Sequence, residues 1–162
     1  MQQPTGGGPL AAGVTMSAAE LLAKLARDAG EPGLAAQAES LRERAAPLVD
    51  AAASAYEAAI GSSGDDYEVG RAYAHAAEPP LRIVEAAADV AALAACVAQQ
   101  GDPARRADAV AAGLLAAGAA RAAAELVAIN LTMSAGDERA RRAASLADDA
   151  ARAAETARTA QE

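Results

Sequence analysis

The sequence predicts an all-α protein, and three features of its composition lead to that prediction. Apolar residues make up 53% of the 162 residues, yet the chain has no Phe, no Trp and only three Tyr. Alanine, the best helix former, supplies most of the apolar count, whereas strand-favouring β-branched and aromatic residues are scarce. Gly and Pro divide the chain into long uninterrupted segments. We therefore expect one domain over residues 1–162, a bundle of about five Ala-rich helices.

The helix boundaries follow from the Gly, Pro and capping residues that flank each segment. The first helix is expected to begin at Pro9, after the glycine loop of residues 4–8, and to end at Ala29. A later start near Ser17 is the alternative, because Ser17 and Glu20 have the spacing of a capping box. The other expected helices cover residues 34–60, 67–77, 81–99, 103–133 and 138 to near the end.

Prolines should shape two of these segments. Pro47 lies inside the helix of residues 34–60, where it removes a backbone hydrogen bond, so we expect a kink there. Pro79 and Pro80 should separate the short helix of residues 67–77 from the next one.

The helix of residues 103–133 is expected to be the buried centre of the bundle. Asp102 is a suitable N-cap, and Pro103 fits the first helical position. From residue 107 to residue 131 the segment carries only three charges, so it is apolar on nearly all sides. Two of those charges, Arg121 and Glu125, are four residues apart and are expected to form a buried ion pair.

Charge and motifs argue against several classes of function. The net charge of −8 disfavours non-specific nucleic-acid binding, which requires a basic face. We expect no secretory signal and no membrane span, hence a cytoplasmic protein. His75 is the single histidine, and Cys96 the single cysteine, expected as a small buried apolar residue. No zinc, P-loop or dinucleotide-binding pattern is present in the sequence, so we expect no metal and no cofactor.

Four short motifs occur in a fixed order along the chain. They are PTGGG at residues 4–8, AYAHAAEPPLRIVEAA at 72–87, GDPARRADAVAA at 101–112 and LVAINL at 126–131. With these motifs in this order, and with LVDAAASAY at 48–56 in the place of the family's LVDxDAxAF, the chain resembles the cyclodeaminase/cyclohydrolase family. The resemblance covers almost the whole chain. It implies a helical bundle, a homodimer, and a cleft for a one-carbon tetrahydrofolate near the glycines.

The resemblance also implies a reaction and a set of site residues. Family members hydrolyse 5,10-methenyltetrahydrofolate or expel ammonia from 5-formiminotetrahydrofolate, and both reactions need a proton donor or acceptor. Gly6, Gly7 and Gly8 match the family's glycines, and Asn130 matches the Asn of its INL motif. Asp50 and Asp108 match family aspartates and are the expected acid/base groups. Arg105 and Arg106 are expected to meet the pterin or a glutamyl carboxylate while Asp108 contacts pterin nitrogens; the alternative is that all three belong to a solvated first helical turn.

One departure from the family pattern leaves the function open. The family's catalytic carboxylate is the second Asp of LVDxDAxAF, and this chain has Ala52 there. Residues two apart on a helix point about 200° apart, so Asp50 does not simply replace it. A non-catalytic homologue serving as a scaffold or partner subunit is therefore the alternative to an enzyme. A third possibility is an Ala-rich interaction bundle with only compositional similarity.

Overall fold

The computed structural model describes residues 6–134 and 136–160, which contain no strand. Within these ranges the α-helices are α1 (Gly7–Asp28), α2 (Pro32–Ala45), α3 (Leu48–Ile60), α4 (Asp66–Ala76), α5 (Glu78–Gln100), α6 (Arg106–Asn130) and α7 (Glu138–Thr159), with a short 3-10 turn, η1 (Pro103–Arg105), before α6. The expected all-α bundle is confirmed.

The first helix differs from the prediction at its start. α1 begins at Gly7, so two of the glycines expected in a loop belong to its first turn, and the alternative start near Ser17 is wrong. Gly30, with φ of 77°, follows the end of α1, as its position before a proline suggested.

The prolines mark helix boundaries more sharply than expected. Pro47 does not kink one long helix but precedes α3, so the segment of residues 34–60 is two helices, α2 and α3. Pro79 and Pro80 lie in the first turn of α5, which starts at Glu78, only two residues after α4 ends. This placement costs little because the first N–H groups of a helix have no intrahelical partner.

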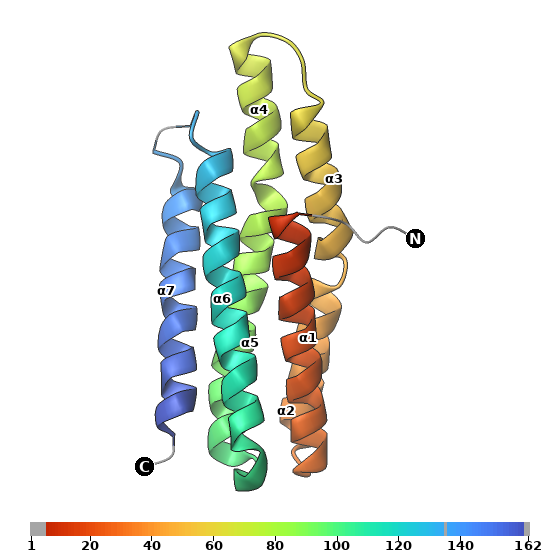
Figure 1. Cartoon of the computed structure of the whole chain (residues 1–162), viewed down its shortest axis with the longest axis vertical. Coiled ribbons are helices and arrows are strands. Elements are labelled where there is room, and N and C mark those ends of the chain that lie inside the picture. Colours follow the sequence, from red (N-terminus) through yellow and green to blue (C-terminus); the bar gives the residue numbers. More distant parts are fainter. Residues whose placement is uncertain (1–5, 135, 161–162) are drawn as a thin grey trace.

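The helices pack in two groups that share α5 and α6 (Figure 1). α5, α6 and α7 pack against one another, and α1 packs against α5, α6 and α2. α3 and α4 form a hairpin that extends beyond the end of the bundle (Figure 1). α1 and α6 run antiparallel: Gly7 at the start of α1 lies beside Leu126 of α6, while Asp28 at its end pairs with Arg105.

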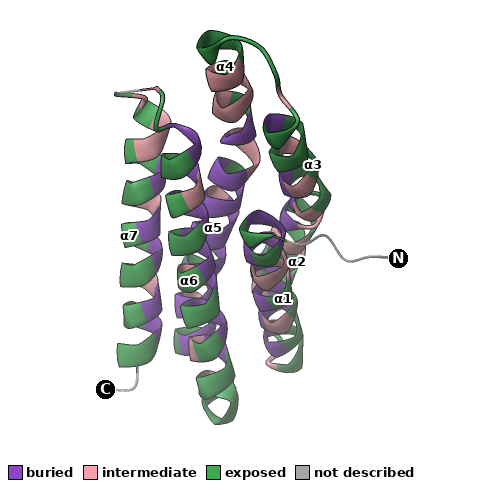
Figure 2. Cartoon of the chain, turned by 45° about the horizontal axis from the view of Figure 1, so that its top comes forward, coloured by how far each residue is buried: buried purple, intermediate pink, exposed green. Residues whose placement is uncertain are grey.

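Burial places α5, not α6, at the centre of the core. Residues of α5 are buried along its whole length, whereas α6 and α7 each keep an exposed side (Figure 2). α6 buries a stripe of small residues, and Gly113 brings its backbone close to Ala94 of α5. Its opposite side exposes large apolar residues, including Leu114 and Leu115. The prediction that this helix is buried on nearly all sides is therefore wrong.

Two further predictions about the core need correction. Arg121 and Glu125 are both exposed, and Arg121 pairs instead with Asp148 of α7 at 2.5 Å. Both side chains project from the outer side of α6. They are exposed because only the stripe of small residues on the inner side packs against α1, α5 and α7. Cys96 is a free thiol that is half-buried at the surface of α5.

One helix in the described ranges is long and apolar enough to span a membrane. It covers Pro103–Asn130, and 44% of its apolar window is buried inside the bundle. Packing against three other helices is the behaviour of a core helix, for which the same length and composition suffice.

Candidate functional site

A cavity of about 310 Å³ lies where the start of α1 meets the end of α6. Its walls come from four parts of the chain: Gly6–Pro9 at the start of α1; Ala52, Ala53 and Tyr56 of α3; Ala76 and Pro80 around the α4–α5 junction; and Leu126, Ile129 and Asn130 of α6. We call this space the glycine cavity. It brings together three of the sequence motifs that carry the family resemblance.

The glycines allow α1 to pack closely at this position. A Cβ on Gly8 would lie 2.9 Å from the Cβ of Ala52, closer than real Cβ atoms approach one another. A Cβ on Gly7 would lie 3.5 Å from Leu126 Cδ1, an ordinary contact. The N–H groups of the first turn of α1 have no partner within the helix, and they belong to residues that line the cavity.

Asn130 fixes the opposite wall of the cavity. Its side chain is buried, and Nδ2 donates a hydrogen bond of 3.1 Å to the carbonyl oxygen of Ala76, at the end of α4. Oδ1 has no hydrogen-bond partner among the described residues, yet it is not fully buried. Asn130 therefore joins α6 to the α4–α5 junction and leaves one acceptor available at the cavity.

Arg139 of α7 holds the same junction from the other side. Its guanidinium donates to the carbonyl oxygen of Ala74 at 2.9 Å and to Glu78 Oε1 at 2.5 Å. It also pairs with Asp137, whose carboxylate caps α7 by accepting from the backbone N–H of Arg139. These hydrogen bonds from Arg139 lower the pKa of Asp137 to about 2. The junction is thus pinned by two side chains.

The glycine cavity is almost free of titratable groups. Among the residues that line it, Tyr56 is the only one with an ionisable side chain, and Asn130 is the only other polar one. Ala52 is buried against Gly8, whereas Asp50 is exposed, as expected from their angular separation on α3. Neither Asp50 nor any other carboxylate is among the described residues that line the cavity.

The structure separates the other predicted site residues from the glycines. Arg105 pairs with Asp28 at 3.6 Å, and Arg106 Nε donates to the carbonyl oxygen of Ala98 at 2.9 Å. Asp108 is exposed in the first turn of α6. Asp28 ends α1, so these groups lie about 30 Å from Gly7, given a rise of about 1.5 Å per residue. Within the chain, the structure therefore does not bring Arg105, Arg106 and Asp108 together with the glycines.

The apolar walls of the cavity come from residues that lie in the sequence motifs but were not expected as site residues. Tyr56 lies at its mouth with 52% of its surface exposed, and Leu126 and Ile129 form the α6 side. Tyr56 follows Ala52 by four residues, so helical spacing places both on one face of α3. That spacing could have indicated Tyr56 as a wall residue from the sequence. Leu126 and Ile129 could not be identified without knowing how α1 packs against α6.

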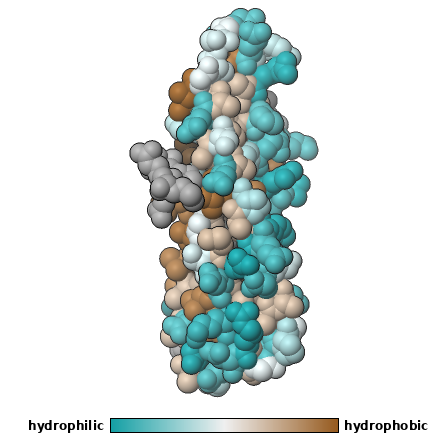
Figure 3. Space-filling view, turned by 90° about the vertical axis from the view of Figure 1, so that its right-hand side faces the viewer, coloured by the Kyte–Doolittle hydropathy of each residue, from teal (hydrophilic) through white to brown (hydrophobic). Residues whose placement is uncertain are grey.

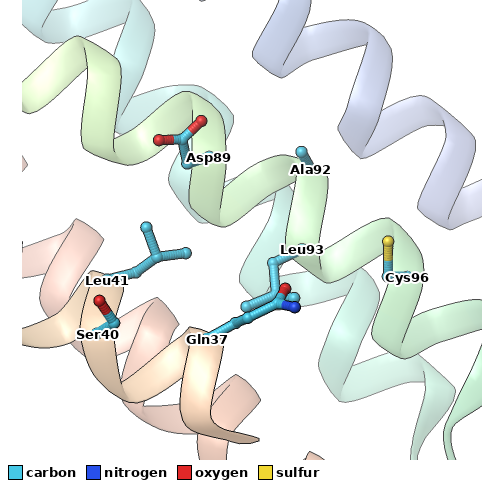
Figure 4. A pocket seen from close by; sticks show the side chains of 7 residues that line it. All are labelled: Gln37, Ser40, Leu41, Asp89, Ala92, Leu93 and Cys96. Atoms are coloured by element: carbon cyan, nitrogen blue, oxygen red, sulfur yellow. The ribbon is translucent and has the colours of Figure 1, made fainter. Parts of the chain in front are cut away.

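A second hollow, of about 410 Å³, lies between α2 and α5 (Figure 4). Gln37, Ser40 and Leu41 enter it from α2, and Asp89, Ala92, Leu93 and Cys96 from α5 (Figure 4). Asp89, its charged side chain, is already paired with Arg44 at 2.5 Å. Within the described ranges, no group of three or more His, Cys, Asp or Glu residues could hold a metal ion. The glycine cavity is therefore the stronger candidate site.

Comparison with known proteins gives one informative similarity. No model of a known protein family matches the chain, and no curated protein sequence matches it. The structure is similar to the crystal structure of formiminotetrahydrofolate cyclodeaminase from Thermotoga maritima, with a TM-score of 0.82 and 19% sequence identity. The match covers 99% of this chain and 87% of that protein. The fold that the sequence resemblance implied is confirmed.

Proposed function

We propose that this protein acts in one-carbon folate metabolism and binds a tetrahydrofolate derivative in the glycine cavity. The observation that carries the proposal is convergence: Gly6–Gly8, the α3 motif around Ala52, and Asn130 meet in one cavity. These segments are far apart in the sequence, and chance similarity in Ala-rich composition would not bring them together. The fold shared with a folate cyclodeaminase supports the same function.

The cavity suits the bicyclic head of the folate better than the whole molecule. Its volume of about 310 Å³ is at the lower end of the range for ligand pockets. Its apolar walls favour a flat ring, and Tyr56 at the mouth can stack against an aromatic part of the ligand. The first-turn N–H groups of α1 and Oδ1 of Asn130 supply a few directional polar contacts. The anionic glutamyl tail would extend outside.

The proposed reaction is hydrolysis of 5,10-methenyltetrahydrofolate or cyclodeamination of 5-formiminotetrahydrofolate. In the hydrolysis, water adds to the carbon between N5 and N10 and releases one proton. The remaining hydroxyl proton is then transferred to N5 as the bond from the carbon to N5 breaks, which leaves the formyl group on N10 of 10-formyltetrahydrofolate. A carboxylate is the fitting group to move these protons. We propose Asp108 of the second subunit of a homodimer for this role, with its Arg105 and Arg106 toward the anionic tail. Within one chain these groups lie about 30 Å from Gly7, and Asp50 does not line the cavity.

A second candidate function is folate binding without catalysis, as a scaffold or partner subunit. The specific observation in its favour is Ala52, which faces Gly8 where the family pattern has a carboxylate. Under either function we propose a cytoplasmic homodimer that takes a folate and needs no metal, nucleic acid or membrane.

Binding can be tested by thermal unfolding with 5-formyltetrahydrofolate, a stable one-carbon folate. At a ligand concentration of about 100 times Kd, the stabilisation is about 2.7 kcal/mol, or roughly 5–10 °C in Tm for a chain of this size. Tyr56→Ala should reduce the shift, whereas Tyr67→Ala, an exposed tyrosine outside the cavity, should not. No shift for the wild type would refute the proposed function.

Catalysis can be tested by the decay of methenyltetrahydrofolate absorbance. Loss of a wild-type rate in Asp108→Asn, with folate binding unchanged, would support the enzyme. A bound folate with no rate above the uncatalysed one would support the binding-only homologue. In that case Ala52→Asp should create turnover, because it places a carboxylate in the cavity beside Gly8.

A further inference from the structure

At the α4–α5 junction, proline leaves the backbone short of a hydrogen-bond donor. Only Ala77 separates the two helices, and its carbonyl oxygen accepts from the N–H of Leu81 at 3.1 Å. In a continuous helix the carbonyl oxygen of Ala76 would accept from the N–H four residues later. That residue is Pro80, which has no N–H, so this carbonyl needs another donor. Asn130 of α6 supplies it, through the hydrogen bond of 3.1 Å from Nδ2.

A second side chain, Arg139 of α7, connects the two helices at this junction. Its Nη1 donates to the carbonyl oxygen of Ala74 in the last turn of α4 and to Oε1 of Glu78, the first residue of α5. Nε and Nη2 donate to the two carboxylate oxygens of Asp137 at 3.1 and 2.8 Å. Because this second pairing is bidentate, it fixes the plane of the guanidinium. One oriented side chain of α7 therefore holds the end of α4 against the start of α5.

Apolar packing contributes little to the position of α4. Among its 11 residues only Ala76, in the last turn, is buried. The tip of the hairpin that α3 and α4 form is mostly hydrophilic (Figure 3), so it offers little apolar surface to bury on the bundle. A helix that loses backbone hydrogen bonds at proline can tilt there. The direction of α4 therefore depends on the side-chain hydrogen bonds at its base.

We propose that Arg139 is a positioning residue for the glycine cavity, an inference that rests on the proposed function. Arg139 is not among the residues that line the cavity, so it would not touch a bound folate. It acts through Glu78 and the last turn of α4, which adjoin the wall residues Ala76 and Pro80. While the junction is held, Ala76 accepts from Asn130, and Oδ1 of Asn130 stays available to a ligand. Without Arg139, α4 can tilt, and this wall no longer matches the bicyclic head.

The first test measures the direction of α4 and needs no ligand. In a Cys96→Ala background, nitroxide labels at Tyr67→Cys on α4 and Ala151→Cys on α7 report the distance between the hairpin and the bundle, since both positions are exposed. Pulsed electron paramagnetic resonance should give one narrow distance distribution for the labelled chain with Arg139 intact. Arg139→Ala should broaden or shift that distribution, because α4 is then free to tilt.

Arg142→Ala is the matched control for this test. Arg142 also joins α7 to α5, through an ion pair with Glu85 at 2.6 Å, but it makes none of the hydrogen bonds that hold the junction. It should leave the distance distribution unchanged. Arg139→Lys replaces Arg139→Ala if the alanine variant does not fold: it keeps the charge, but one ammonium does not reproduce the planar fork, so it too should broaden the distribution. An unchanged distribution in the variant that folds would overturn the proposal.

The second test measures the affinity for 5-formyltetrahydrofolate by titration calorimetry. The Kd should rise at least about fivefold in Arg139→Ala, the lower end of the coupling found between separate sites, and Arg142→Ala should keep the wild-type Kd. A lower Tm in Arg139→Ala with an unchanged Kd would mean that Arg139 only stabilises the bundle, and would overturn the proposal. A wild type that binds no folate would refute the proposed function. The distance distributions would then still support or overturn the role of Arg139 at the junction.

Discussion

Gly8→Ala should destabilise the protein, although alanine is the better helix former. The added Cβ would lie 2.9 Å from Ala52 Cβ, whereas carbon atoms in contact prefer about 3.5–4.0 Å. α1 and α3 must therefore separate by roughly 0.6–1.1 Å, and overpacking of this kind costs about 1–3 kcal/mol. Gly13→Ala is the control, because a Cβ there meets nothing within 4 Å and should stabilise α1 by about 0.5–1 kcal/mol.

The assay is thermal unfolding of both variants under identical conditions. A difference of about 2 kcal/mol between them corresponds to about 4–8 °C in Tm for a chain of this length. Ala52→Gly removes the opposing methyl, so the double variant Gly8→Ala/Ala52→Gly should recover at least about 1 kcal/mol relative to additivity. If Gly8→Ala raises Tm as much as Gly13→Ala, the close approach of α1 and α3 is not what requires glycine.

Three further predictions concern side chains around the cavity and on α6. Asn130→Leu leaves the Ala76 carbonyl without its partner and should cost about 1–3 kcal/mol in urea unfolding; a cost under about 0.5 kcal/mol would contradict the pinning role. Arg139 lowers the pKa of Asp137 to about 2, so the stabilisation is present above pH 4 and is lost as pH falls toward 2. Between pH 4 and pH 2 the free energy of unfolding of the wild type should fall by up to about 2 kcal/mol through this group. Asp137→Asn should lack that part of the pH dependence. Arg121→Ala should change stability by less than about 1 kcal/mol, because its ion pair is exposed; a larger loss would restore the buried pair expected from sequence.

Capping residues and glycines in the sequence predicted several helix ends correctly, because their effect depends only on neighbouring residues. Asp102 caps η1 through a hydrogen bond to the N–H of Ala104, and Gly30 takes the positive φ that follows α1. Proline was harder to interpret, since a ring that removes one hydrogen bond can kink a helix or divide it. At Pro47 the chain divides, and no local pattern distinguished the two outcomes.

The packing of the helices determines which side chains of α6 are buried, which ion pairs form and where a cavity lies, and the sequence pattern did not predict these features. The near absence of charge in α6 does not indicate which side of the helix faces the core, so Leu115 was expected inside although it is exposed. Likewise Arg121 has a carboxylate four residues later, but in the structure it pairs with Asp148 of α7. The glycine cavity needed the antiparallel contact of α1 with α6, which joins residues more than a hundred positions apart.

The walls of the glycine cavity restrict how its specificity can change. Half of the lining residues are Gly or Ala, so the wall formed by Gly6–Gly8, Ala52 and Ala53 holds little side-chain volume that a substitution could remove. On that side a larger ligand could be admitted only by moving helices apart, which would weaken the core that α1 shares with α5 and α6. New preferences there must therefore arise by adding atoms, for example at Ala52 or Ala53. Enlargement by single substitutions is confined to the opposite wall and the mouth, where Leu126, Ile129 and Tyr56 can be truncated.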